Sequence, residues 1–270
     1  MYKQNLHTHG NLADGLDSYE SIVERAIELG FESIGFSEHA YMFYSDYSII
    51  NERTIPTYKA EINRLKEKYK DIIPIYLGLE FDQYSTEPTS GFEFIIASNH
   101  YLKRGDEYLS FDRDYKTVER LINDYFNGNS IEFACEYFKQ FSTVCDYCKP
   151  DIIGHFDIFT KHIDSHRFID TTDKKYRESA IECLRILAKK VDVFEVNTGA
   201  MARYGKKLPY PETFILKELL KLNKQVIISS DCHDKRYLNC NFDKTEELLK
   251  EVGFKNTVIF NGKKFIENPL

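Results

Sequence analysis

Two histidines lie one residue apart near the start of the sequence, in NLHTHGNLADG, residues 5–15. Side chains at positions i and i+2 of a strand point to the same side, so His7 and His9 would face one space while Thr8 faces away. Two imidazoles placed in this way can clamp one metal ion. Asp14 belongs either to an ordinary Asp-Gly turn or to the same site as a hard oxygen ligand, and we favour the ligand.

Further histidines and two carboxylates come at the ends of predicted strands. Beyond His7 and His9, these residues are His39, Glu80, His100, His155, Asp231 and His233. A single histidine at a strand end is often only a satisfied polar group, but this many such placements are hard to explain in that way. Imidazole and carboxylate ligands suit zinc, iron or manganese, and their number predicts two or three divalent ions that share ligands.

The elements that must position these residues alternate between strand and helix. Apolar runs predict strands at residues 2–7, 32–39, 73–80, 92–100, 151–155, 192–198, 225–231 and 256–260. Helical spacing predicts helices at residues 18–29, 57–69, 129–148, 174–190, 211–223 and 243–252. This alternation indicates an α/β protein with parallel strands, and the lack of a dinucleotide or P-loop fingerprint favours a barrel of fewer than eight strands. The carboxyl ends of barrel strands share one face, where the predicted ligands would converge.

The composition narrows the class of protein and of partner. The chain has 270 residues and a net charge of −7, which argues against nucleic acid as a partner of its surface. No apolar run approaches the roughly 20 residues of a membrane span, and the first residues lack a signal-peptide pattern, so we expect a cytoplasmic protein. The six cysteines are then reduced thiols, including the C-x-x-C pair Cys145 and Cys148, which no second pair completes into a zinc ribbon.

A cluster of divalent ions suits the hydrolysis of a small phosphate ester. Such ions bind the phosphate oxygens, lower the pKa of a bound water toward ~7, and let an acidic protein hold an anion. Arg203 follows the sixth predicted strand, and its planar fork suits a phosphate, although a solvated loop arginine stays open. Lys161 is a second, weaker candidate for binding the phosphate. Residues 101–128 form an insertion after the fourth strand, either a solvated loop or a segment that shapes substrate binding near the active face.

Seven short motifs, taken together and in their order along the chain, resemble the PHP (polymerase and histidinol phosphatase) superfamily. They most closely resemble its stand-alone histidinol-phosphatase branch. The motifs are HTH at 7–9, SEHA at 37–40, GLE at 78–80, NHYL at 99–102, GHFD at 154–157, EVNTGA at 195–200 and SSDCH at 229–233. H-x-H alone would not be specific, but the ordered set is. One departure is the sequence before His100, where Ala97, Ser98 and Asn99 replace the usual G-S-x pattern.

The resemblance implies a distorted (β/α)7 TIM-like barrel, a single domain over residues 1–270, and a site for three metal ions. The implied ligands are His7, His9, Glu80 and Asp231 for one ion, Glu80, His100 and His155 for a second, and Asp14, His39 and His233 for a third. The implied reaction is hydrolysis of L-histidinol phosphate by a bridging hydroxide, and we expect Glu80, Asp231 and His233 to be catalytic residues. Arg203 and Lys161 remain the candidates for phosphate binding, as argued above from their positions.

Two alternatives remain at this point. Instead of a histidinol phosphatase, the chain could be another PHP phosphoesterase that acts on a nucleotide, a sugar phosphate or a phosphotyrosine protein. The second alternative is a metal-binding PHP module without catalysis. The complete ligand set and the acidic composition argue against the second alternative. The oligomeric state is not indicated by the sequence.

Overall fold

The computed structural model describes residues 3–45 and 54–270. Its strands are β1 (Gln4–Asn5), β2 (Ser33–His39), β3 (Ile75–Asp82), β4 (Phe94–Ser98), β5 (Tyr101–Arg104), β6 (Glu107–Ser110), β7 (Ile152–Ile153), β8 (Val193–Asn197), β9 (Gln225–Ser229), β10 (Asn256–Phe260) and β11 (Phe265–Pro269). Its α-helices are α1 (Tyr19–Glu28), α2 (Ile55–Lys68), α3 (Tyr115–Phe126), α4 (Ser130–Phe141), α5 (Lys174–Leu187), α6 (Gly199–Arg203), α7 (Thr213–Lys221) and α8 (Phe242–Val252). Short 3-10 helices are η1 (Val144–Asp146), η2 (Ile158–His162) and η3 (Lys235–Tyr237).

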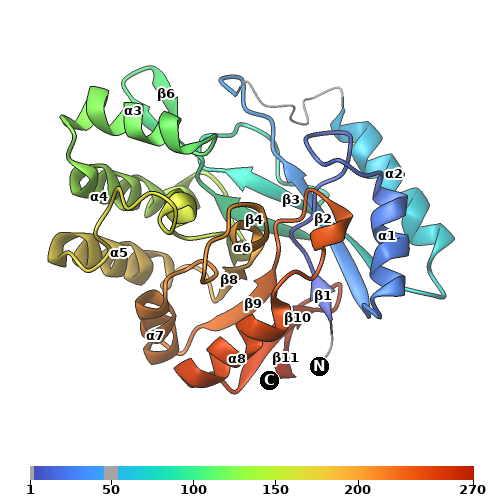
Figure 1. Cartoon of the computed structure of the whole chain (residues 1–270). Coiled ribbons are helices and arrows are strands. Elements are labelled where there is room, and N and C mark those ends of the chain that lie inside the picture. The colour runs from blue at the N-terminus through green and yellow to red at the C-terminus, as the bar shows by residue number, and fades with distance from the viewer. Residues whose placement is uncertain (1–2, 46–53) are drawn as a thin grey trace.

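Within the described ranges, seven parallel strands form one sheet in the order β1-β2-β3-β4-β7-β8-β9. The first and last strands meet just beyond their carboxyl ends, where Thr8 and Cys232 form a parallel bridge. The amide of His9 donates to the Cys232 carbonyl at 2.9 Å, and the Cys232 amide donates to the His7 carbonyl at 3.0 Å. The sheet is therefore a nearly closed barrel with helices around it, which confirms the predicted distorted TIM-like fold (Figure 1).

The amino end of the barrel is closed differently, by a hairpin that the sequence analysis predicted only in part. Strand β10 was expected, but its antiparallel partner β11 was not. The side-chain amide of Gln4 makes the two hydrogen bonds to β10 that the backbone of a neighbouring strand would otherwise make. Its Nε2 donates to the Phe260 carbonyl at 2.8 Å, and its Oε1 accepts from the Phe260 amide at 2.8 Å. The first described strand, β1, and the C-terminal hairpin consequently lie close together at this end (Figure 1).

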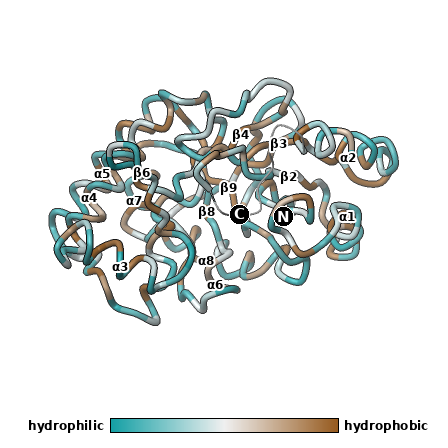
Figure 2. Tube along the Cα trace, turned by 90° about the horizontal axis from the view of Figure 1, so that it is seen from above, coloured by the Kyte–Doolittle hydropathy of each residue, from teal (hydrophilic) through white to brown (hydrophobic). Residues whose placement is uncertain are grey.

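The outer helices are amphipathic, as their spacing predicts. In α1, Ser18 caps the first turn by accepting from the Ser21 amide, Ile22 and Val23 are buried, and Gly30 takes a left-handed φ of 70° just past the helix end. Figure 2 shows hydrophobic and hydrophilic residues alternating along these helices. The buried faces pack on the outer side of the strands and form the larger of the two cores.

Several predicted boundaries need correction. The strand predicted to end at residue 7 ends at Asn5, the one predicted to end at His100 ends at Ser98, and the one predicted to end at Asp231 ends at Ser229. Strand β3 does not end at Glu80 but continues to Asp82. The helix predicted over 129–148 ends at Phe141, and Cys145 lies in the separate 3-10 helix η1. Residues 101–128 are not an irregular loop, since they form the hairpin β5–β6 and helix α3. The chain there contains enough apolar residues to bury Val118, Leu121 and Ile122 on one helix face.

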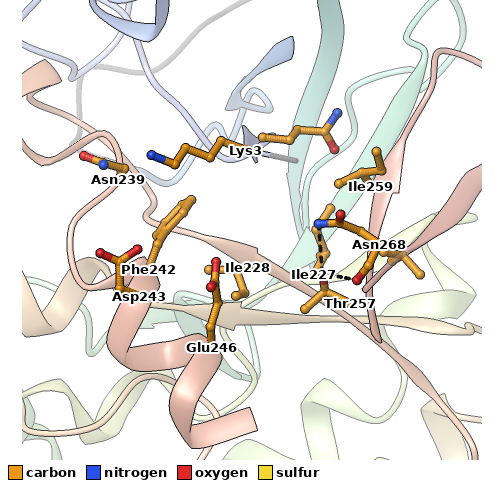
Figure 3. Close-up of a pocket in the computed structure, with 12 residues that line it drawn as sticks. Lys3, Ile227, Ile228, Asn239, Phe242, Asp243, Glu246, Thr257, Ile259 and Asn268 are labelled. Atoms are coloured by element: carbon orange, nitrogen blue, oxygen red, sulfur yellow. Dashed lines mark hydrogen bonds between the residues drawn. The ribbon is translucent and has the colours of Figure 1, made fainter. Parts of the chain in front are cut away.

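The cavity drawn in Figure 3 lies between α8, β9 and the β10–β11 hairpin. Its volume is only ≈ 20 Å³, about that of one water molecule. The labelled side chains are mostly apolar or amide groups, with Lys3, Asp243 and Glu246 at the rim. This cavity is therefore no candidate for the chemistry predicted above. Within the described residues, no helix is long and apolar enough to cross a membrane.

Candidate metal centre

The nine predicted metal ligands come together at the carboxyl ends of the strands. Their donor atoms fall into four overlapping groups, each with all atoms within 4.8 Å of one another. The groups are His9, Asp14, His39 and His233; His7, Glu80 and His155; His7, His9 and Asp231; and His39, Glu80 and His100. Among the described residues, these groups contain the nine predicted ligands and no others. The predicted convergence is therefore what the geometry shows.

Glu80 lies at the centre of this cluster, on the inward face of β3. Distances from its two carboxylate oxygens are 3.0 Å from Oε1 to His155 Nε2, 3.6 Å from Oε1 to His100 Nε2, 2.9 Å from Oε2 to His39 Nδ1 and 3.2 Å from Oε2 to His7 Nε2. The two oxygens thus face different sets of imidazoles. A carboxylate placed in this way can bridge two ions.

Asp231 enters the cluster through an unusual backbone conformation. Strand β9 ends at Ser229 and not at Asp231 as predicted, so Asp231 and His233 are not on a strand. Instead, Asp231 takes a left-handed φ of 46° that few non-glycine residues adopt. Its Oδ1 then lies 3.2 Å from His9 Nε2 and 3.4 Å from His7 Nε2.

Asp14 is held in the cluster by a tight turn. The amide of Gly15 donates to the Gly10 carbonyl at 3.2 Å, and a Cβ on Gly15 would lie 2.4 Å from the His9 carbonyl oxygen. Only glycine permits this close approach. Asp14 Oδ2 consequently lies 3.2 Å from His233 Nε2 and 3.5 Å from His39 Nε2.

Several buried atoms of the cluster have no hydrogen-bond partner among the described residues. They are His7 Nε2, His9 Nε2, His39 Nδ1, Glu80 Oε2 and Asp14 Oδ1. A buried polar atom without a partner costs about 1–3 kcal/mol, so such a concentration needs an explanation. Nitrogen and carboxylate lone pairs that face one another across about 3–4 Å are the donor set of a divalent metal site, and the residues present therefore fit metal ions.

The electrostatics of the cluster favour positive charge at its centre. Burial disfavours ionisation of Glu80, but His7 and His39 hold the pKa of this carboxyl well below its usual range. Burial also disfavours a charged His7, but Glu195, Glu80 and Asp231 raise the pKa of its imidazole well above the usual value. Protons on these imidazoles and divalent cations compete for the same lone pairs, so metal binding here would release protons.

A cavity of ≈ 690 Å³ opens above the cluster, a volume typical of small-molecule sites. Arg203 and Lys161 both line it. Arg203 is the last residue of α6, and its side chain is 27% exposed, but its guanidinium is held at the cluster: Nη2 lies 2.7 Å from Asp231 Oδ2 and Nη1 lies 3.0 Å from His233 Nδ1. Lys161 is 4% exposed, and its ammonium group lies 2.8 Å from Asp112 Oδ1. Both predicted phosphate contacts therefore stand beside the cluster as fixed cations.

The segment after the fourth inner strand contributes to the cavity wall. Asp112, Arg113 and Asp114, just before α3, line the cavity together with Asp14. Burial opposes ionisation of Asp112, but Lys161 lowers the pKa of its carboxyl. This segment therefore supplies three of the charged residues that line the cavity.

Three buried carboxylates that the sequence analysis did not select lie directly behind the histidines. Asp82 Oδ2 lies 3.0 Å from His100 Nδ1, Glu38 Oε2 lies 3.6 Å from His9 Nδ1, and Glu195 Oε1 lies 2.6 Å from His7 Nδ1. The sequence carries a signal for Glu195, because it stands between two apolar residues of a buried strand, whereas Glu38 and Asp82 lie close to the predicted ligands His39 and Glu80 without such a pattern. A charged residue in a buried strand is costly unless it has a specific partner.

Comparisons with known proteins agree with this geometry. The family model described as PHP domain matches residues 4–199. The histidinol-phosphatase of Lactococcus lactis is 28% identical over 283 residues, covering 99% of this chain and 98% of the relative. The histidinol-phosphatase of Bacillus subtilis is 26% identical, covering 86% of this chain and 94% of the relative.

One solved structure is similar over nearly the whole chain. It is the histidinol phosphate phosphatase of Lactococcus lactis in complex with zinc, L-histidinol and phosphate. The TM-score is 0.74 at 24% sequence identity, and the match covers 98% of each chain. The two chains therefore share a fold.

Proposed function

Because the chain belongs to the PHP domain family, we propose that it is a metal-dependent phosphatase that hydrolyses L-histidinol phosphate to L-histidinol and phosphate. The relatives that it matches over most of their length are named histidinol-phosphatase. The similar Lactococcus lactis structure holds zinc together with L-histidinol and phosphate, the products of this reaction.

The observation that carries the reaction class is the convergence of nine imidazole and carboxylate side chains beside one cavity, which five of them line: Asp14, His39, His100, Asp231 and His233. Divalent ions held there would supply positive charge to the phosphate oxygens and lower the pKa of the water that attacks phosphorus. We propose three ions. His7, His9 and Asp231 would hold the first, His100 and His155 the second with Glu80 shared between them, and Asp14, His39 and His233 the third.

Two cations beside the cluster would bind the phosphate. Arg203 presents a planar guanidinium whose hydrogen bonds to Asp231 and His233 fix its orientation. Its remaining N–H groups support contacts with two phosphate oxygens. Lys161 uses hydrogen bonds to Asp112 to place a point charge in the same cavity. Both residues would thus orient the substrate before water attacks.

The substrate assignment is tested by a panel of phosphomonoesters with the zinc- or manganese-loaded protein. We expect kcat/KM for L-histidinol phosphate to exceed that for p-nitrophenyl phosphate by more than about 100-fold, since specific contacts to the amine and imidazole add transition-state binding. AMP, glucose 6-phosphate and a phosphotyrosine peptide complete the panel. A higher value for one of these would assign another phosphoesterase, and no hydrolysis by the fully loaded protein would indicate a binding module.

The number of ions is tested with Asp14→Ala. Because Asp14 supplies the carboxylate beside His39 and His233, we expect this variant to hold about one ion fewer per chain than the unchanged protein, measured by elemental analysis after gel filtration. Asp17→Ala is the matched control, since Asp17 lies in the same loop but accepts from the Lys235 amide outside the cluster. Equal metal content in both variants would reduce the proposed site to two ions.

A further inference from the structure

Glu195 is a carboxylate that the proposed reaction does not use, yet it is buried at the centre of the barrel. It lies on β8 between Phe194 and Val196, and it is 2% exposed. A carboxylate buried at such a position costs several kcal/mol unless its oxygens are fully hydrogen-bonded. Its contacts therefore indicate what it does.

Both oxygens of Glu195 accept from donors on neighbouring elements. Oε1 accepts from His7 Nδ1 at 2.6 Å and from the Ser229 hydroxyl. Oε2 accepts from the His155 amide at 2.6 Å and from Asn197 Nδ2 at 3.0 Å. The carboxylate therefore connects the chain at the carboxyl ends of β1, β7, β8 and β9 through side-chain hydrogen bonds.

The bond to His7 fixes the tautomer of this ligand. An ionised carboxylate only accepts hydrogen bonds, so His7 Nδ1 donates to Glu195, and Nε2 is the nitrogen left to offer a lone pair to a metal ion. That Nε2 is the atom 3.2 Å from Glu80 Oε2 and 3.4 Å from Asp231 Oδ1. Glu195 therefore decides which nitrogen of His7 is available as a ligand.

The bond to the His155 amide acts on the opposite side of Glu80. It holds the backbone just beyond the two-residue strand β7, where His155 Nε2 lies 3.0 Å from Glu80 Oε1. One carboxylate thus positions two ligands that face the two different oxygens of Glu80. The other two carboxylates behind the histidines each contact the ring of a single candidate ligand, since Asp82 contacts His100 and Glu38 contacts His9.

We propose that Glu195 is a positioning residue that sets the distance between two ion sites on either side of Glu80, by fixing the ring of His7 and the backbone of His155. The proposal rests on the metal centre of the proposed function but not on its substrate. Partners in the second layer of metal sites typically contribute 10–100-fold in metal affinity. Metal binding itself, rather than turnover, is therefore the main readout.

The test compares Glu195→Gln with the unchanged protein by competitive titration with a chelator and zinc. The glutamine side chain keeps the shape of glutamate, but an NH₂ group takes the place of one of the two oxygens. This NH₂ group then faces hydrogen-bond donors from which it cannot accept. We expect zinc affinity at one or two sites to fall about 10–100-fold. Long-range ¹⁵N spectra of the imidazoles should show His7 losing its single tautomer. With L-histidinol phosphate, or any substrate the panel identifies, kcat should recover at high zinc while KM stays unchanged.

Asp151→Asn is the control variant. Asp151 Oδ2 accepts from the Ile95 amide at 2.8 Å, so it also joins two neighbouring strands through a backbone N–H, but it contacts no histidine of the cluster. This variant should keep full zinc affinity. Ser229→Ala, which removes one donor from Glu195 without touching a ligand, should weaken zinc binding in the same direction by a smaller factor if Glu195→Gln does not fold. Unchanged zinc affinity and an unchanged His7 tautomer in folded Glu195→Gln would overturn the proposal.

Discussion

The two ends of the barrel interior have opposite chemistry. The amino end is filled by an apolar cluster that includes the hairpin β10–β11. Its members are Leu6, Tyr76, Phe94, Ile96, Ile152, Val193, Ile227, Val258 and Phe260. The carboxyl end is filled by imidazoles and carboxylates, of which several are entirely buried. The apolar end stabilises the fold through burial at about 25 cal/mol per Å², whereas the polar end buries charge at a cost that bound ions would offset.

Strand β3 shows both ends within one element. Its inward residues run from Tyr76 through Gly78 and Glu80 to Asp82, so hydrophobic packing at Tyr76 gives way to a candidate metal ligand four residues later, at Glu80. Gly78 marks the change, because a Cβ there would lie 2.2 Å from the ring of Phe94. The same strand alternation therefore serves stability at one end and chemistry at the other. Four variants test how separate these two roles are.

The largest effect is expected from Glu80→Gln. Loss of one carboxylate charge between the imidazoles should remove a shared ligand and lower kcat/KM by more than about 10³-fold, with metal content reduced. Steady-state kinetics and elemental analysis check this. Glu93→Gln is the control, since Glu93 accepts from the Leu77 amide of the same strand without facing the cluster. A Glu80→Gln protein with near-normal turnover would contradict the assignment of the polar end to catalysis.

Phe260→Ala should have the largest effect at the apolar end. The Phe260 ring packs against Tyr76 at 5.2 Å and Phe94 at 5.8 Å between ring centroids. Truncation should leave a cavity in the apolar cluster at the amino end of the barrel and lower the free energy of unfolding by about 3–5 kcal/mol. Urea unfolding measures this change. Activity per folded molecule should stay within about two-fold, and a parallel loss of metal would show that the two ends are coupled.

Arg203→Ala should give a smaller effect on chemistry. Removing the guanidinium takes away phosphate contacts and a partner of Asp231, so we expect kcat/KM to fall about 30–100-fold, with weaker inhibition by inorganic phosphate. Arg236→Ala is the control, because Arg236 is 74% exposed and does not line the cavity, although its partner Asp234 does. If both variants behaved alike, Arg203 would have no special role in binding the phosphate.

Gln4→Ala should have the smallest effect. It leaves the amide and the carbonyl of Phe260 without the side chain that joins β10 to the barrel, and it should cost about 1–3 kcal/mol of stability. Hydrogen exchange should increase first in β10 and β11 and not around the cluster. Faster exchange at His7 and Cys232 instead would show that the hairpin also supports closure at the polar end.

The convergence of the candidate ligands could be predicted in large part, because their positions follow from local rules. Alternation along a strand and the common direction of parallel strands place His39, Glu80 and His155 on one face without any knowledge of long-range contacts. The elements were also recognisable from periodicity, although β3 is longer than predicted and the helix after residue 129 is shorter. Arg203 was correctly placed beside the site, but its bond to Asp231 was not foreseen.

The sequence by itself therefore determined the residue types of the metal centre, the α/β class and the strand ends that carry the ligands. Only the tertiary structure decided how the barrel closes, that Asp14 reaches His39 and His233, and that Glu195 lies behind His7. The reason is physical. Periodicity fixes the side of an element on which a residue lies, but the contact between His7 and Glu195 joins positions 188 residues apart. Such a contact exists only when all the intervening strands have assembled.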